Sequence, residues 1–181
     1  MTVEIRLSGS GGQGILLAGE ILAEALAFHE GKNVSLSTSY AGQVRGGSSR
    51  CDVLFCEDSQ EIDFPQVTRA DILLAMTREA LLESVSLVKE KGVVVTDATY
   101  IQEKVESKGK VYSYPLTLTA KEQLGTAQAA NILALGIIAQ ITGIVKQASL
   151  KEALAKKVPE REKEVNQAAL RLGFEIGIAL K

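Results

Sequence analysis

Residues 3–17 read VEIRLSGSGGQGILL, and this stretch decides the fold class. The segment 3–8 alternates apolar and polar side chains, which predicts a short strand. The segment 9–14 is a glycine-dense turn of the pattern G-x-G-x-x-G, and apolar residues recur at helical spacing from Ile15 onward. A strand, a glycine turn and a helix in this order are typical of the first unit of an α/β sheet.

The rest of the chain alternates strands with helices and then becomes helical. The patterns predict further strands at 34–39, 51–56, 72–75, 93–96 and 111–114, and helices at 15–28, 78–91, 117–126, 128–143, 149–157 and 160–180. This order predicts an α/β, Rossmann-like three-layer fold with a mostly parallel sheet and a helical C-terminal portion. Because no repeat, linker or low-complexity run interrupts the chain, we expect residues 1–181 to form a single domain.

The composition excludes several kinds of chemistry. The 181 residues carry a net charge of −2, so no bulk field attracts nucleic acid or an anionic membrane. With one His and two Cys, a His-based triad, a multi-His metal site and a four-Cys cluster are disfavoured. Cys51 and Cys56 are expected to be small apolar packing residues.

Targeting features are also absent from the sequence pattern. The first residues, MTVEIRL, lack the basic and apolar regions of a signal peptide, so we expect a cytoplasmic protein. The uncharged segment 123–145 is long enough to span a bilayer, but polar residues interrupt it. We therefore expect a buried or interfacial helix there and no membrane association.

The glycine turn leaves two interpretations open. A dinucleotide site would need a carboxylate after the second strand, which instead ends in the sequence STSY at 37–40. A P-loop would need Lys and then Ser or Thr after Gly14, where Ile15 and Leu16 stand. The turn is then either a tight strand-to-helix connection without a ligand or a contact for an anion or a partner.

A second glycine-rich loop follows the second predicted strand. It contains Tyr40 and the run Arg45, Gly46 and Gly47, where an arginine fork beside a pliable backbone suits a phosphate or a carboxylate. The alternative is an ordinary ion pair in a flexible loop.

Three single residues stand out elsewhere. Asn131 lies in an apolar helix, where its amide needs a partner that the glycine-rich loops can supply. Asp97, at the end of a strand, is expected to be a cap or turn residue. His29, at the end of the first helix, is expected to be structural.

Several of these motifs resemble the gamma subunit of 2-oxoacid:ferredoxin oxidoreductases. They are GSGGQG at 9–14 followed by ILLAG, the pair Ser39-Tyr40 leading to Arg45-Gly46-Gly47-x-Ser49, Asn131 with Gly136, and Pro159 followed by Asn166. The likeness extends over nearly the whole chain, and the Arg-Gly-Gly-x-Ser form is most similar to the 2-oxoglutarate branch. The sequence AGQV at 41–44 departs from the family's usual Gly-Pro-Glu before the arginine.

The resemblance implies a Rossmann-like subunit of a multi-subunit enzyme. That enzyme converts a 2-oxoacid and coenzyme A to acyl-CoA, CO₂ and reduced ferredoxin. The expected 2-oxoacid is 2-oxoglutarate, and the branched-chain, pyruvate and indolepyruvate branches stay open as alternatives. Thiamine diphosphate, Mg²⁺ and [4Fe-4S] clusters would belong to the alpha and beta subunits, with a delta subunit as a further candidate. This chain would hold no cofactor firmly and no catalytic or metal-binding residue, it would be inactive alone, and a gamma–gamma dimer stays open.

The resemblance also implies a set of contact residues. They are Gly9, Gly11, Gly12, Gln13, Gly14, Tyr40, Arg45, Gly46, Gly47 and Asn131. Two alternatives remain beside it, namely a stand-alone nucleotide-binding protein and an assembly subunit whose glycine loops bind no small molecule.

Overall fold

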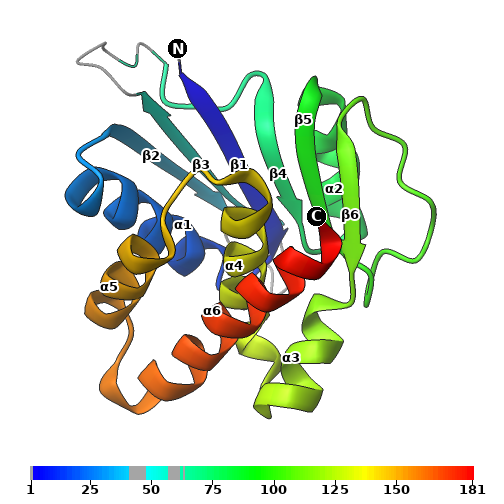
Figure 1. The fold of residues 1–181 in the computed structure, drawn as a ribbon. Coiled ribbons are helices and arrows are strands. Elements are labelled where there is room, and N and C mark those ends of the chain that lie inside the picture. Colours follow the sequence, from blue (N-terminus) through cyan, green and yellow to red (C-terminus); the bar gives the residue numbers. More distant parts are fainter. Residues whose placement is uncertain (1, 41–47, 57–61, 63) are drawn as a thin grey trace.

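The computed structural model describes residues 2–40, 48–56, 62 and 64–181. Within them, six strands form one sheet in the order β2-β3-β1-β4-β5-β6 (Figure 1). The strands are β1 (Val3–Ser10), β2 (Asn33–Tyr40), β3 (Ser48–Cys56), β4 (Ala70–Ala75), β5 (Val88–Asp97) and β6 (Lys110–Tyr114). Only β3 runs against the others, since it pairs antiparallel with both β1 and β2. The pairs β1–β4, β4–β5 and β5–β6 are parallel, which confirms the mostly parallel sheet.

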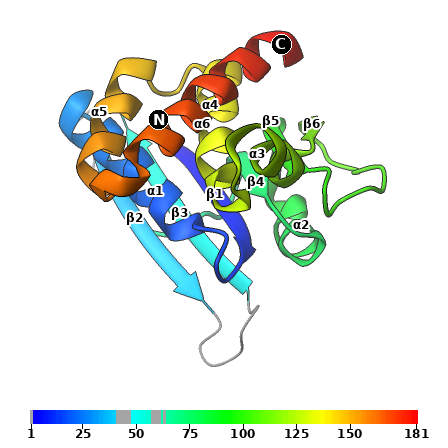
Figure 2. The same cartoon turned by 90° about the horizontal axis from the view of Figure 1, so that it is seen from below.

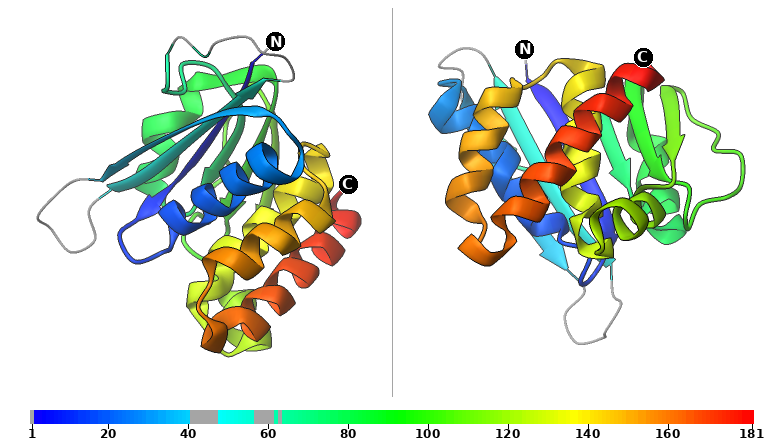
Figure 3. Two further views of the ribbon diagram at one scale, coloured as in Figure 1. Left: turned by 90° about the vertical axis from the view of Figure 1, so that its left-hand side faces the viewer. Right: turned by 60° about the horizontal axis from the view of Figure 1, so that its bottom comes forward.

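Helices cover the two faces of the sheet unequally (Figures 1 and 3). Most of them lie on one face, which we call the α1 face, and α2 lies on the other, the α2 face. The helical elements are α1 (Ile15–Glu24), the π-helix η1 (Ala25–His29), α2 (Arg78–Ser84), the 3₁₀ turn η2 (Val85–Leu87), α3 (Leu116–Leu124), the 3₁₀ turn η3 (Ala127–Ala129), α4 (Ala130–Thr142), α5 (Gln147–Lys157) and α6 (Glu160–Leu180).

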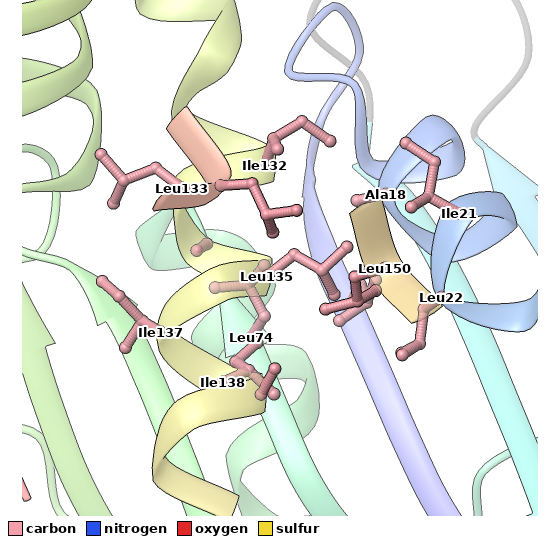
Figure 4. Packing of buried hydrophobic residues seen from close by; sticks show 14 of the residues in the cluster. Ala18, Ile21, Leu22, Leu74, Ile132, Leu133, Leu135, Ile137, Ile138 and Leu150 are labelled. Carbon is pink, nitrogen blue, oxygen red and sulfur yellow. The ribbon is translucent and has the colours of Figure 1, made fainter. Parts of the chain in front are cut away.

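The α1 face holds the larger core. Successive strand side chains point to opposite faces, so Ile5 and Leu7 of β1 face this core together with Leu74 of β4. Side chains of α1 and α4, among them Leu22 and Leu135, fill the space above them (Figure 4).

Helix α4 is the central element of that core. All but Gln140 and Thr142 of its residues are buried. It crosses α6 so closely that a Cβ built at Gly136 would lie 2.6 Å from the backbone oxygen of Leu170. The buried helix predicted from the uncharged segment is therefore confirmed. No helix among the described residues is long and apolar enough to cross a membrane.

The predicted helix at 78–91 is wrong in its second half. Helix α2 ends at Ser84, and β5 begins at Val88. Leu81, Val85 and Val88 all pack into the core of the α2 face, and their spacing imitates a helix although the chain has changed to a strand. Gly92 lies within β5, where a Cβ would come within 3.2 Å of the Ala70 carbonyl oxygen.

Candidate functional site

The glycine turn after β1 is held by hydrogen bonds within itself. The Gln13 amide oxygen accepts a hydrogen bond from the Ser10 N–H at 2.8 Å, and the Gln13 N–H donates to the Ser10 carbonyl at 3.2 Å. A Cβ at Gly9 would meet Gln13 Oε1, so a larger residue there would displace the hydrogen-bonded amide of Gln13. Gly9 and Gln13 thus shape the turn, while Gly11 and Gly12 are exposed at its tip.

Asn131 joins this turn to the start of α4. Its side chain is 2 % exposed, and its Nδ2 donates to the Gly14 carbonyl at 2.8 Å. Its Oδ1 accepts from the N–H of Ile132. Gly14 has a φ of 71°, and a Cβ there would lie 2.3 Å from Asn131 Nδ2, so any other residue is both strained and obstructed. The prediction that the buried amide finds its partner in a glycine-rich loop is confirmed.

A cleft of about 280 Å³ opens beside this contact. Its lining residues come from the glycine turn and from the starts of three helices, and they are Gly12, Gly14, Leu17, Thr126, Gln128, Ala129, Asn131, Glu162, Val165 and Asn166. Figure 2 looks onto this end of the molecule, where the parallel strands end.

The electrostatics of the cleft favour a negatively charged ligand. Helices α1 and α6 begin at its wall, and no side chain caps the N-terminus of either. Both starts present backbone N–H groups and the positive end of a helix dipole, whereas α4 continues from η3, whose start is capped by Thr126. The opposing charge is Glu162, and the Arg161 guanidinium lies 3.3 Å from its carboxylate.

Asn166 gives the cleft a further polar group. It is 7 % exposed, and its Nδ2 donates to the Glu162 carbonyl at 2.8 Å. No hydrogen bond to its Oδ1 is formed within the described parts of the chain, so this oxygen can accept one from a ligand.

The two strands that flank the second glycine-rich loop in the sequence reach the same sheet edge as the first glycine turn. Tyr40 ends β2 and pairs through its backbone with Ser49 of β3, which in turn pairs with Gly9 of β1. Arg45, Gly46 and Gly47 lie outside the described residues. Because β3 separates β1 from β2, the end of the second strand lies about 10 Å from β1 and not directly beside it, where a ribose-binding carboxylate would be needed. The topology therefore argues against a dinucleotide site.

Two other candidates have structural roles. Asp97 is fully buried, and its carboxylate accepts hydrogen bonds from the N–H groups of Thr99 and Thr117. These bonds confirm the prediction that Asp97 is a cap or turn residue. His29 Nδ1 lies 3.0 Å from the Glu152 carboxylate on α5, so it links α5 to the end of the first helix.

The described residues do not suit an iron–sulfur cluster. They contain no group of three or more His, Cys, Asp or Glu side chains that could hold a metal ion. Burial, and then the negative charges of Asp52 and Glu20, raise the pKa of the Cys51 thiol to about 12. A thiol held protonated in this way is a poor metal ligand, since the thiolate is the form that binds metals.

Thr126, Gln128 and Glu162 were not predicted from the sequence. Thr126 accepts a hydrogen bond from the Gln128 N–H and so caps η3, a local signal that Thr before a helix start could have given. Glu162 gave no such signal, because only the packing of α6 brings it to the glycine turn.

The chain resembles known proteins over nearly its full length. Residues 4–176 match the family model "Pyruvate ferredoxin/flavodoxin oxidoreductase". The 2-oxoglutarate synthase subunit KorC of Methanocaldococcus jannaschii is 36% identical over 178 residues, which is 97% of this chain and 94% of that protein. The ketoisovalerate oxidoreductase subunit VorA of Methanothermobacter marburgensis is 31% identical over 96% of this chain but only 36% of its own length.

Solved structures show the same similarity over nearly the whole chain. A keto/oxoacid ferredoxin oxidoreductase gamma subunit from Geobacter sulfurreducens is 36% identical, with a TM-score of 0.89, and the match covers 100% of this chain and 99% of that one. The 2-oxoglutarate:ferredoxin oxidoreductase of Magnetococcus marinus, solved with 2-oxoglutarate, coenzyme A and succinyl-CoA bound, shares the fold with a TM-score of 0.83 at 23% identity. There the match covers 99% of this chain and 32% of that one.

The chain belongs to the pyruvate ferredoxin/flavodoxin oxidoreductase family. Within this family it is a gamma subunit of a multi-subunit 2-oxoacid:ferredoxin oxidoreductase, as its relatives of matching length are. The resemblance inferred from the glycine motifs is confirmed.

Proposed function

We propose that the glycine turn and the adjoining cleft hold coenzyme A, the acyl acceptor, beside the subunits that carry the thiamine chemistry. The observation that carries this proposal is that the two uncapped helix starts of α1 and α6 meet at one cleft next to an exposed glycine turn. Coenzyme A is anionic through its phosphates, and helix N-termini with exposed glycines are a common setting for phosphate.

Each part of the cleft has a role in this proposal. The backbone N–H groups after Gly14 and at Gly12 face the phosphates, and Asn131 fixes the turn relative to α4. Asn166 Oδ1 accepts from an amide of the ligand. We expect Arg45 of the second loop to bind a phosphate with its planar guanidinium, and Gly46, Gly47 and Tyr40 to be further contact residues.

Charge substitutions in the holoenzyme test the proposal. Gln128→Glu adds a carboxylate to the cleft and should raise the KM for coenzyme A by roughly tenfold with little change in kcat, since about 1.4 kcal/mol of binding free energy corresponds to that factor. Gln123→Glu makes the same change on the exposed surface of α3, away from the cleft, and should leave the KM unchanged. Arg45→Ala should also raise the KM.

The result that would contradict the proposal is equally specific. If Gln128→Glu and Arg45→Ala assemble normally and keep the KM for coenzyme A, the cleft does not bind it. Impaired assembly with an unchanged KM would favour an assembly subunit without a ligand, and tight binding of NAD, FAD or ATP by the isolated chain would favour a nucleotide-binding protein.

We also infer that the 2-oxoacid is 2-oxoglutarate. Four KorC subunits of 2-oxoglutarate synthases are 35–36% identical to this chain over 96–97% of its length. Two VorA subunits and two common gamma subunits of pyruvate/ketoisovalerate oxidoreductases are 31–33% identical over 96% of it. The enzyme's rates with 2-oxoglutarate, pyruvate, 2-oxoisovalerate and indolepyruvate test this inference, and a preference for any of the last three would overturn it.

The proposal also assigns the cofactors to the other subunits of the enzyme. We propose that residues 1–181 act as one gamma-subunit domain in the cytoplasm, inactive alone. Thiamine diphosphate, Mg²⁺ and the [4Fe-4S] clusters would be held by the alpha and beta subunits, with delta as a further candidate, and ferredoxin would dock on the complex. A brown, thiamine-dependent complex alongside a colourless isolated chain would be the expected outcome.

A further inference from the structure

The two edges of the sheet are built differently. The edge strand β2 (Asn33–Tyr40) has eight residues without charge or proline, and it pairs with β3 in unbroken register. The opposite edge strand, β6, has five residues and begins at a lysine. Within the described residues no strand pairs with the outer side of β2, which is the arrangement that soluble proteins usually avoid by charge, proline or a bulge.

The side chains of β2 reinforce the exposed edge. Val34, Leu36 and Thr38 lie on the α1 face, since their partners on β3 point into the larger core. Leu36 is 39% exposed although it lies on this apolar side. Phe28, in the π-helix η1 that contacts β2, is 75% exposed.

We propose that β2 pairs antiparallel with β2 of a second copy of this chain, around a two-fold axis that passes between the two Leu36 residues. Residues directly opposite each other in a sheet share one face, so this register places Leu36 against Leu36, Val34 against Thr38, and Ser35 against Ser37. Each of these pairs is uncharged. The two sheets join into one of twelve strands, and the exposed Leu36 side chains cover each other.

The choice of a second copy rests on the chemistry of the strand. From Asn33 to Tyr40 the strand carries no charge, so it offers no charge pattern that would select a different, complementary strand. A neutral strand whose apolar and hydroxyl side chains are arranged nearly symmetrically around Leu36 matches itself. A two-fold interface uses the same patch on both subunits, which is the commonest symmetry of homo-oligomers.

Charged substitutions of Leu36 test the position of the proposed two-fold axis directly. Leu36→Glu places two carboxylates opposite each other, and Leu36→Lys places two ammonium groups there. Each variant of the chain should raise the dimer dissociation constant by roughly tenfold or more in sedimentation equilibrium, because like charges in contact oppose pairing. An equimolar mixture of the two variants should associate again, since the opposite charges then meet across the axis.

A matched control uses the other edge. Ser113 is exposed on β6, so Ser113→Glu introduces the same charge on an edge strand outside the proposed interface and should leave the dissociation constant unchanged. Circular dichroism verifies that each variant is folded. A wild-type chain that stays monomeric, a dimer that tolerates both variants, or a mixture that fails to associate would each overturn the proposal. Lost assembly of the holoenzyme with a monomeric wild-type chain would assign the edge to another subunit.

Discussion

The two faces of the sheet bury their residues by different means. On the α1 face, aliphatic side chains and glycines bring helices close together, and a Cβ built at Gly173 of α6 would lie 2.2 Å from the Leu133 carbonyl oxygen of α4. The α2 face is smaller and contains a buried ion pair, in which Arg6 of β1 meets Asp52 of β3 through two hydrogen bonds of 2.8 Å.

The difference reflects what each face must hold. The α1 face positions α1, α4 and α6, whose starts line the cleft, and close contact between helices fixes those starts. On the α2 face the ion pair ties strands to a loop, since Arg6 also donates to the Val67 carbonyl and Asp52 accepts from the Val67 N–H. The α1 face is thus held together by close packing, and the α2 face by a buried ion pair whose hydrogen bonds are satisfied.

The largest expected effect comes from breaking the charge pair. Arg6→Leu leaves the Asp52 carboxylate buried without its partner, and Asp52 is 2 % exposed. Loss of one member of a buried pair typically costs about 3–5 kcal/mol of unfolding free energy, which urea denaturation can measure.

Two further variants separate charge from size. The double variant Arg6→Leu with Asp52→Leu should regain much of the loss, because an apolar pair leaves no uncompensated charge. Arg78→Leu breaks the ion pair with Glu103, in which both side chains are largely exposed, and should change stability little. A double variant no more stable than Arg6→Leu would mean that packing, not charge, dominates the α2 face.

A smaller effect is expected from the glycines of the α1 face. Gly173→Ala pushes a methyl group against the backbone of α4, and overpacking of this kind costs about 1–3 kcal/mol even though Ala favours helices. A Cβ at Gly177 would lie 2.7 Å from the Gln140 Cβ and 3.2 Å from the Ile137 carbonyl oxygen, a looser approach to the α4 backbone than at Gly173, so Gly177→Ala should cost less. Denaturation of both variants gives the difference, and equal costs would contradict a backbone-limited crossing.

Much of this fold could be predicted from periodicity. The strand, turn and helix at the N-terminus and the four helices after residue 115 follow from local patterns. The end of α2 could not be found in this way, because Leu81, Val85 and Val88 keep a helical spacing while their backbone changes from helix to strand. The buried pair of Arg6 and Asp52 was also missed, since its partners are 46 residues apart and only the β1–β3 register brings them together.

The candidate site was predicted unevenly for the same reason. Gly14 and Asn131 stood out because glycine density and a lone amide in an apolar helix are visible in sequence, and the structure joins them. Glu162 lies on a helix whose sequence indicates only a charged first turn, so its place in the cleft depends on the α4–α6 crossing.

The smallest effect on stability at neutral pH belongs to Cys51, which tests how closed the α1 face is. The raised pKa of Cys51, about 12, means that the folded protein keeps the thiol protonated while the unfolded chain, with a pKa near 9.0, loses the proton. Stability from this group is therefore complete below pH 9 and declines as the pH rises from 9 towards 12. In a Cys56→Ala background, Cys51 should react with iodoacetamide at pH 8 roughly a thousandfold more slowly when folded than in urea, as mass spectrometry can follow. Rapid reaction of the folded protein would mean that the α1 face opens to solvent. The two faces would then differ in their residues but not in how tightly they are packed.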